Sequence, residues 1–258
     1  MAATGHLLEA DRVSLVYRTS RDPIHALDEL SLRVGAGEFV AVLGPSGCGK
    51  STFLKLASGL LRPTAGRLTL GGTPVLGPRR DVGVVFQQAT LLPWKTVLAN
   101  VLVPCRALGL EPGPSRERAL DLLRLTRLED FAGNYPAELS GGMQQRVALA
   151  RSLVHDPSVL LMDEPFGALD AMTREHMAVE LQRLWLRTGK SVLFITHSIP
   201  EAVFLADRVV VLSARPARVL DEVPVELPRP RDLSTMAERG FAELCNRLRT
   251  MFGSAGLD

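Results

Sequence analysis

The chain has 258 residues, of which 46% are hydrophobic and 22% are charged, and its formal net charge is +2. This is the balance of an ordinary globular protein, and the small net charge gives no electrostatic reason to expect a nucleic-acid partner. No stretch approaches the ~20 apolar residues of a membrane-spanning helix, and residues 1–10 lack the pattern of a secretory signal, so we expect neither. The cysteines Cys48, Cys105 and Cys245 lie far apart without metal-ligand spacing, which predicts free thiols.

The N-terminal part of the chain predicts a small antiparallel sheet. Residues 8–17 and 26–34 alternate apolar and polar side chains, as half-buried strands do. A polar stretch at 19–23 predicts the turn between them, and Gly35-Ala36-Gly37 turns the chain towards a third strand.

A glycine-rich segment then separates a buried strand, predicted at 38–43, from a helix predicted at 50–59. It fits Gly-x-x-x-x-Gly-Lys-[Ser/Thr], the phosphate-binding loop, in which backbone N–H groups and the helix N-terminus hold a polyphosphate. A turn of this composition that binds nothing is the alternative, and the strand–loop–helix context disfavours it. We expect Lys50 to reach the β- and γ-phosphates and the Ser51 hydroxyl to bind Mg²⁺. The predicted phosphate-binding residues are Gly44, Pro45, Ser46, Gly47, Cys48, Gly49, Lys50, Ser51 and Thr52. The position of Cys48 in this loop leads to the hypothesis that its oxidation or alkylation blocks nucleotide binding, and the sequence leaves its redox sensitivity open.

The middle of the chain changes from strands to helices. Short strands are predicted at 67–70 and 82–86, and Gln87 follows the second. Helical spacing follows at 96–108 and 115–128, with Pro112-Gly113-Pro114 expected to separate the two helices. A further helix is predicted from Ser140 to about residue 154. We therefore expect a helical subdomain, at about 91–153, to be inserted into an α/β core.

The remaining chain alternates between strands and helices. Strands are predicted at 159–162, 191–195 and 208–212, and helices at 171–187 and 201–206. This alternation predicts the α/β class: a phosphate-loop core whose mainly parallel sheet carries helices on both faces. The tail at about 216–258 predicts an edge strand, an extended crossing segment and a helix at 233–252, which we expect to dock on its own core.

Polar residues follow three of the predicted strands. Asp163 ends an apolar strand and is predicted to hold Mg²⁺ directly or through water, and Glu164 to act as the general base. His197 follows the strand at 191–195, from where it would face the γ-phosphate. Gln87 is a weaker candidate for binding Mg²⁺ or positioning water. A solvated strand end and a structural histidine are the plain alternatives, and the neighbouring phosphate loop favours the functional interpretation.

The segment Leu139-Ser140-Gly141-Gly142-Met143-Gln144-Gln145-Arg146 decides the family resemblance. It resembles the signature of the ATP-binding-cassette (ABC) ATPases, and the resemblance extends over residues 8–212. Further matches are Tyr17 with the aromatic residue that stacks on adenine, Gln87 with the glutamine loop, and His197 with the switch histidine. Asp170 matches the loop that crosses the dimer interface.

The resemblance implies a single ABC ATPase domain over residues 1–258, with ATP and Mg²⁺ as cofactors. It implies a head-to-tail dimer in which Ser140, Gly141 and Gly142 act in trans on the ATP of the partner, leaving open whether the subunits are identical. The ATPase would lie peripherally on the cytoplasmic face of the inner (plasma) membrane. There it would drive membrane permease subunits that are supplied by a solute-binding protein.

The stretch 91–97 is similar to importers of the nitrate, sulfonate and taurine group, as is the tail segment 225–231. Importers for thiamine precursors share the pattern, so the sequence leaves the solute open. Trp94 within this stretch is either buried core or part of the permease-docking groove.

Two other functions remain as alternatives. One is a soluble ABC ATPase acting on DNA or the ribosome, which would be expected to carry a second cassette, a coiled coil or a cysteine cluster. The other is a regulator that binds ATP without hydrolysing it, against which Glu164 and His197 argue.

Overall fold

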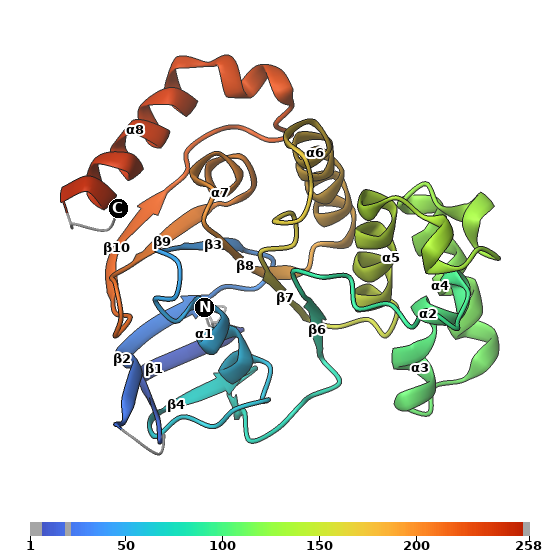
Figure 1. Ribbon diagram of the computed structural model, residues 1–258, viewed down its shortest axis with the longest axis horizontal. Coiled ribbons are helices and arrows are strands. Elements are labelled where there is room, and N and C mark those ends of the chain that lie inside the picture. The colour runs from blue at the N-terminus through green and yellow to red at the C-terminus, as the bar shows by residue number, and fades with distance from the viewer. Residues whose placement is uncertain (1–6, 19–21, 255–258) are drawn as a thin grey trace, which may run out of the picture. The chain divides into compact units, whose positions relative to one another are not determined.

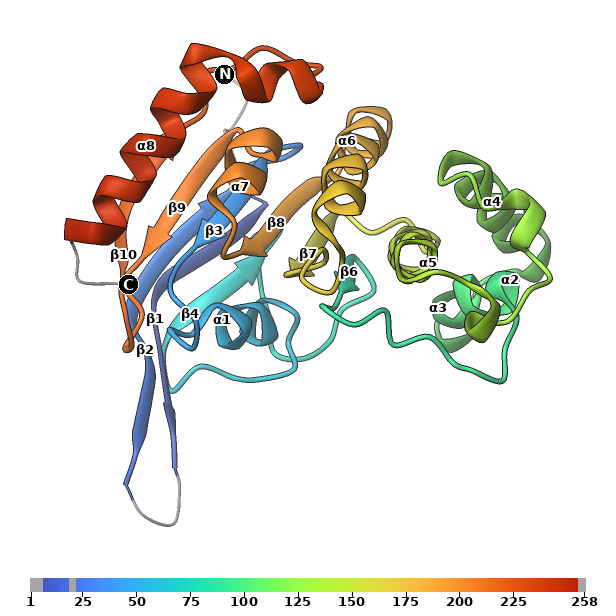
Figure 2. The same ribbon diagram turned by 45° about the horizontal axis from the view of Figure 1, so that its top comes forward.

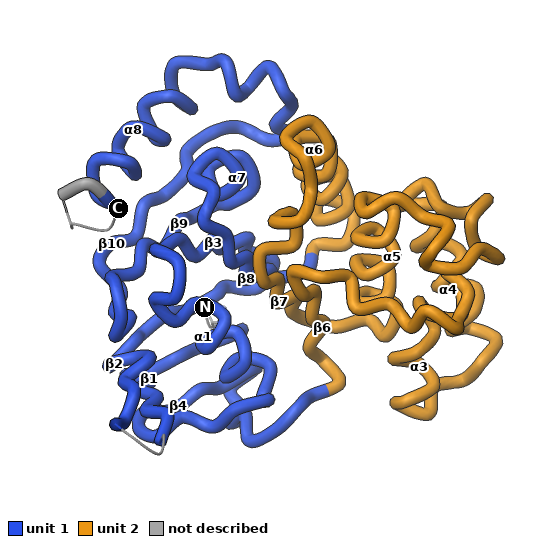
Figure 3. The backbone as a smooth tube through the Cα atoms, viewed as in Figure 1, with its two compact units in different colours: residues 1–79, 190–258 blue, residues 80–189 orange. Residues whose placement is uncertain are grey.

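The computed structural model describes residues 7–18 and 22–254. The chain divides into two compact units, the first formed by residues 1–79 and 190–258 and the second by residues 80–189 (Figure 3). The predicted helical subdomain at 91–153 lies inside the second unit, and its exact boundaries stay a prediction. Residues 19–21 of the predicted polar turn lie outside the described part.

The first unit contains the expected antiparallel sheet. Its strands are β1 (Leu8–Tyr17), β2 (Ile24–Val34), β4 (Ala65–Leu70) and β5 (Thr73–Pro74), in the order β2-β1-β4-β5. β1 pairs antiparallel with both β2 and β4. Its apolar residues Leu8, Ala10, Val13 and Leu15 are buried, which confirms the alternating pattern. The two-residue strand β5 is too short to carry a periodic signal and was not predicted.

The same unit holds the strands that support the phosphate loop. They are β10 (Val219–Pro224), β9 (Arg208–Leu212), β3 (Phe39–Leu43) and β8 (Ser191–Thr196), in that order. β3 runs parallel to β8 and β9, and β10 closes the edge antiparallel to β9. Every residue of β3 and β8 is buried, so the short continuous apolar runs correctly indicated strands covered on both faces.

Helices α1 (Lys50–Ala57), α7 (Ile199–Leu205) and α8 (Arg239–Ser254) complete the first unit, with a 3₁₀ turn at Leu233–Ala237. α7 packs on β3, and α8 packs on α7 (Figures 1 and 2). The expectation of one helix over 233–252 was wrong. Asp232 accepts hydrogen bonds from the N–H groups of Ser234 and Thr235, which closes a short turn, and Glu238 then takes an extended conformation. The expected docking of the helix is confirmed, because Phe241, Cys245 and Leu248 are buried.

Arg231 fastens the tail to the end of α7. It is buried, and its guanidinium donates to the carbonyls of Val203, Phe204 and Ala206, which end that helix. A second guanidinium nitrogen donates to the carbonyl of Leu227 in the crossing segment. Burial lowers the pKa of Arg231 to about 10, so the side chain stays charged at neutral pH and complements the negative end of the helix dipole.

The second unit pairs two parallel strands with a set of helices. β6 (Val82–Val85) and β7 (Val159–Asp163) run parallel. The helices are α2 (Val97–Val101), α3 (Val103–Ala107), α4 (Pro112–Leu125), α5 (Gly141–Leu153) and α6 (Ala171–Thr188), with 3₁₀ turns at Glu129–Phe131 and Pro136–Glu138. α5 lies at the centre of the helical part and packs against α2, α3, α4 and β6.

Prolines account for two errors in the predicted helices. The single helix expected at 96–108 is divided into α2 and α3 at Leu102, because Pro104 has no N–H group and starts a new first turn instead. Pro112-Gly113-Pro114 does not separate the helices but forms the first turn of α4, where a missing N–H group costs little.

Candidate functional site

Three glycines shape the loop between β3 and α1. Gly47 and Gly49 have φ angles of 74° and 130°, which side-chain-bearing residues rarely adopt. A Cβ on Gly49 would lie only 2.8 Å from the backbone oxygen of Ala26, and one on Gly44 only 2.9 Å from the Cys48 sulfur. The loop can therefore turn this tightly only because glycine stands at these positions.

The N-terminus of α1 has no side-chain cap, because Gly49 stands at the N-cap position. The Lys50 side chain is buried, and its Nζ donates to the carbonyls of Gly44 (2.8 Å) and Pro45 (3.0 Å). Ser51, the predicted Mg²⁺ ligand, is exposed. A helix N-terminus without a side-chain cap, a lysine drawn into the loop and an exposed serine form an arrangement suited to a polyphosphate.

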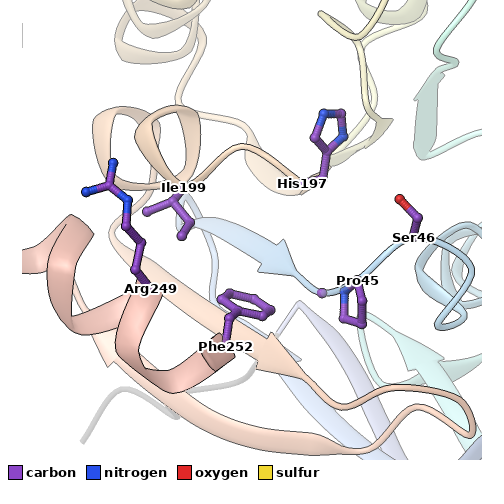
Figure 4. Close-up of a pocket in the computed structure, with 7 residues that line it drawn as sticks. Pro45, Ser46, His197, Ile199, Arg249 and Phe252 are labelled. Atoms are coloured by element: carbon purple, nitrogen blue, oxygen red, sulfur yellow. The ribbon is translucent and has the colours of Figure 1, made fainter. Parts of the chain in front are cut away.

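His197 stands at the same end of the sheet as this loop. Thr196 pairs with Leu43 in the parallel register of β8 and β3, so the next residues, His197 and Gly44, emerge from adjacent strand ends. Both line a cavity of about 680 Å³ (Figure 4). The cavity is also lined by Pro45, Ser46, Ile199, Arg249 and Phe252. Figure 4 shows Pro45, Ser46 and His197 on one side of it and the α8 residues Arg249 and Phe252 on the other.

Sequence reasoning did not single out the two α8 residues, Arg249 and Phe252. Arg249 is exposed and Phe252 is half-buried. The helical spacing of Phe241, Leu244, Leu248 and Met251 predicted only a docking face for this segment, and no local pattern connects Arg249 or Phe252 with the phosphate loop. The fold brings them together because α8 returns along α7, which starts two residues after His197.

Tyr17 lies beside α1, and Cys48 lies within the phosphate loop. Tyr17 ends β1, and its hydroxyl lies 3.3 Å from the Thr52 Oγ1, so it stands beside α1. Its predicted stacking on adenine remains a prediction. All three cysteines are free, as expected, and buried. The thiol of Cys48 is 1% exposed, so a reagent must first open the loop to reach it.

In the second unit, Gln87 lies against the turn that carries the predicted base. β6 and β7 are parallel, and Gln87 and Asp163–Glu164 are found at the carboxyl ends of these strands. A Cβ on Gly167 would lie 3.1 Å from the Gln87 Nε2 and 3.3 Å from the Glu164 backbone oxygen. Glu164 has a φ angle of 44°, a left-handed conformation that it shares with five other non-glycine residues among those described.

The signature segment starts α5 and is tied to the Gln87 loop. Ser140 caps the helix, accepting a hydrogen bond from the Met143 N–H at 3.3 Å. The Gln145 amide donates to the carbonyl of Phe86 (3.2 Å), which directly precedes Gln87. Arg151, farther along α5, donates to the carbonyl of Ala89 at 2.7 Å. Sequence analysis did not identify these hydrogen bonds of Gln145 and Arg151, because a single polar side chain on a packed helix forms no distinctive pattern.

Asp170 caps α6 beside the signature. Its carboxylate accepts from the Thr173 N–H (3.0 Å) and from the Thr173 hydroxyl (2.6 Å), and these hydrogen bonds lower the pKa of Asp170. A Cβ on Gly142 would lie 3.0 Å from the Thr173 Cγ2, so the starts of α5 and α6 are in contact. Gly141, one residue earlier, is exposed.

Trp94 is exposed, which excludes the interpretation as buried core. Its side chain is 70% accessible, although the segment around it is well fixed. The buried Asn100 holds that segment, because its Oδ1 accepts from the Leu92 N–H (2.7 Å) and its Nδ2 donates to the carbonyls of Leu92 and Lys95. The chain thus presents an indole on an ordered loop.

Residues 27–167 match the protein family described as ABC transporter. The chain belongs to the ABC transporter family. It is 46% identical to a taurine import ATP-binding protein of Rhizobium johnstonii over 96% of this chain and 97% of that protein. It is 47% identical to an uncharacterized ABC transporter ATP-binding protein of Methanocaldococcus jannaschii over 89% of this chain and 86% of that protein.

Solved structures agree with this assignment. A dimeric ATP-binding cassette in a post-hydrolysis state, bound to ADP and Pi, is 35% identical with a TM-score of 0.75 and covers 86% of this chain and 100% of its own. The ABC transporter component cbiO1 of Clostridium perfringens is 26% identical with a TM-score of 0.77, covering 95% of this chain and 97% of its own.

These relationships confirm the predicted fold class and the ATPase assignment. The chain is an ATP-binding and ATP-hydrolysing subunit of a transporter, and the importer relatives support the main interpretation rather than a DNA- or ribosome-acting ATPase. Within residues 7–18 and 22–254, no helix combines the length and hydropathy needed to cross a bilayer.

Proposed function

We propose that this chain powers the uptake of a small solute of the nitrate, aliphatic sulfonate or taurine kind through a separate membrane permease. The observation that carries the proposal is the 46% identity to a taurine import ATP-binding protein over nearly the full length of both chains. The solute does not need to touch this subunit, so the identity supports the class of solute rather than one compound.

The predicted residues divide the chemistry between the two units. The phosphate loop and Lys50 of the first unit bind the phosphates, and His197 faces the γ-phosphate from the neighbouring strand end. In the second unit, Glu164 acts as general base on the attacking water, and Gln87 positions that water. The place of Glu164 supports its role, because it follows Asp163 at the carboxyl end of β7, which runs parallel to β6 with Gln87 at its own carboxyl end.

Mg²⁺ fits the donors that the chain offers. Ser51, Asp163 and Gln87 supply oxygen atoms, the ligands that this hard cation prefers. Among the described residues no group of three or more His, Cys, Asp or Glu side chains could hold a metal ion. Mg²⁺ takes few protein ligands and completes its shell with phosphate and water oxygens. When bound, the ion would neutralise charge on the phosphates.

The working form is a dimer in which each ATP meets residues of both copies. Ser140, Gly141 and Gly142 face the ATP held by the partner's phosphate loop, and Asp170 lies at the interface. Support comes from the exposure of Ser140 and Gly141 at a helix N-terminus, where N–H groups can bind an anion. The dimeric cassette relative supports the same assembly.

The Trp94 loop docks the permease on the cytoplasmic face of the membrane. An exposed indole on a loop fixed by a buried asparagine is a typical anchor of a protein interface. Trp94→Ala should reduce the amount of co-purified permease at least tenfold. Leu76→Ala is the matched control, because Leu76 is 68% exposed but belongs to the other unit. Equal loss in both variants would contradict the assigned surface.

The decisive experiment is purification of the tagged chain from its native membranes in mild detergent, followed by mass spectrometry. We expect a multi-span permease, accompanied by a solute-binding protein, and loss of labelled nitrate, taurine or sulfonate uptake in cells that lack this chain. Recovery of only ribosomal or DNA-repair proteins would overturn the transport proposal. A permease with unchanged uptake of these solutes would overturn the solute class alone.

A further inference from the structure

A buried hydroxyl and a buried carboxylate meet directly behind His197. Thr196 ends β8 with 2% of its surface exposed, and Glu201 lies in the first turn of α7 with 8% exposed. The Thr196 hydroxyl donates to the Glu201 Oε2 at 2.6 Å, which is short and typical of a bond to a charged acceptor. Burying a carboxylate is costly, so this pair calls for a physical reason.

The same hydroxyl bridges across His197. Its oxygen accepts a hydrogen bond from the Ser198 N–H at 3.0 Å, so the residues on both sides of His197 are joined. The Ser198 hydroxyl in turn accepts from the Glu201 N–H at 3.4 Å, which caps α7. His197 itself is exposed and lines the cavity with Pro45 and Ser46.

We propose that Glu201, acting through Thr196, is a positioning residue for His197. By accepting a hydrogen bond from the Thr196 hydroxyl, the carboxylate fixes the direction of the hydroxyl, which leaves its lone pairs for the Ser198 N–H. The backbone on either side of His197 is then held in one conformation, which fixes the position of His197 at the edge of the cavity. This inference rests on the proposed role of His197 at the γ-phosphate.

A purely structural role is the competing explanation, because Glu201 also stands in the first turn of α7, where a negative charge is favourable. The two explanations differ in what they predict for turnover. A structural cap affects the stability of the fold, whereas a positioning residue affects the rate at which bound ATP is hydrolysed.

Ser191 provides a matched control on the same strand. It begins β8, is 1% exposed, donates to the Gly35 carbonyl (2.9 Å) and accepts from the Gly37 N–H (2.8 Å). Thr196→Val and Ser191→Ala therefore each remove a buried hydroxyl that makes one donated and one accepted hydrogen bond. Only Thr196 adjoins His197.

The test measures ATP hydrolysis and thermal unfolding of the complex purified through a tag on the full-length chain. We expect Thr196→Val to lower kcat about 10- to 100-fold with KM for ATP within about twofold, as misplacement of a reacting group does. Glu201→Gln should lower kcat less, because its amide oxygen still accepts the hydroxyl. Thr196→Ser should restore turnover, and Ser191→Ala should keep it.

Two results would overturn the inference. One is wild-type kcat in Thr196→Val; the other is an equal loss of kcat in Thr196→Val and Ser191→Ala at equal loss of thermal stability. His197→Ala separates this inference from the proposal beneath it. If that variant hydrolyses ATP normally, the role of His197 fails. If it is inactive while Thr196→Val is normal, only the positioning role of Glu201 and Thr196 fails.

Discussion

Helices α1 and α5, which follow the phosphate loop and begin in the signature segment, differ in how their N-termini are capped. α1, after the phosphate loop, has glycine at its N-cap and no side-chain cap. α5, in the signature segment, is capped by the Ser140 hydroxyl, which accepts from the Met143 N–H. The chain thus has one helix start without a side-chain cap in its first unit and one with a side-chain cap in its second.

The difference indicates two modes of anion binding. At α1 no side chain caps the helix, and a polyphosphate can bind at its N-terminus, where Lys50 adds a charge that neutralises the phosphates. At α5 the chain already satisfies one N–H group, so the helix start is ordered before a partner brings its ATP. The phosphate loop should therefore mainly determine affinity, and the signature helix should affect turnover in the dimer.

The largest expected effect follows removal of the loop's charge. Lys50→Ala should weaken ATP binding about 100-fold, since a hydrogen-bonded charge of this kind contributes roughly 3 kcal/mol. Titration of ATP by calorimetry measures it. Lys55→Ala is the control, because Lys55 is exposed in the last turn of the same helix. Unchanged affinity in Lys50→Ala would break the contrast between the two helices.

The next effect compares two glycines of one loop. Gly49→Ala should weaken ATP binding about tenfold or more, because its Cβ would collide with the Ala26 backbone oxygen in addition to the φ strain of roughly 1–3 kcal/mol. Gly47→Ala should cost less, since no heavy atom lies within 4 Å of its added Cβ. ATP titration and chemical unfolding of both variants check the order, and a greater loss in Gly47→Ala would contradict it.

A smaller effect distinguishes the role of Ser140 as the N-cap of α5 from its proposed role in ATP turnover. Ser140→Ala and Thr96→Ala each remove an N-cap whose hydroxyl accepts a backbone N–H at 3.3 Å, on α5 and on α2. Both should lower the free energy of unfolding by about 1 kcal/mol. Only Ser140→Ala should also lower ATP turnover, by several-fold. Equal turnover in the two variants would leave Ser140 a plain cap.

The smallest effect lies at the far end of α5. Burial lowers the pKa of His155, and its Nε2 bonds to the carbonyl of Val82 while its buried Nδ1 has no partner among the described residues. His155 therefore binds a proton more readily in the unfolded chain than in the folded one. The stability that neutral His155 contributes is fully present above pH 6.5, its ordinary pKa, and is lost as the pH falls through its lowered pKa in the folded chain. His155→Gln should flatten the fall in unfolding free energy below pH ~6.5 relative to His176→Gln, at an exposed site on α6. An unchanged slope would contradict this.

Sequence patterns predicted the parts of the fold that local chemistry determines. The strands β3 and β8 were found because every one of their residues is buried, and the loop glycines because φ and close contacts leave no other choice. Ser140 was placed correctly at a helix start. The division between α2 and α3 was missed because the helical periodicity continues through it and only Pro104 signals a break.

The parts that were missed depend on partners distant in sequence. Arg231 reads as one more basic residue of a proline-rich tail until its carbonyl partners on α7 are seen. Arg249 and Phe252 reach the phosphate loop only through the docking of α8. Glu201 lies five residues from Thr196, but the burial that makes their bond informative is a tertiary property. A single sequence carries no direct signal for such contacts.

The central claim, that each ATP is shared between the phosphate loop of one copy and the signature of another, has a direct test. Glu164→Gln should bind ATP, fail to hydrolyse it and accumulate as a dimer, so light scattering in Mg-ATP should give twice the 28.0 kDa of the chain and the single mass without nucleotide. A variant that binds ATP yet stays at 28.0 kDa at micromolar concentrations, or that hydrolyses ATP at the wild-type rate, would contradict the account.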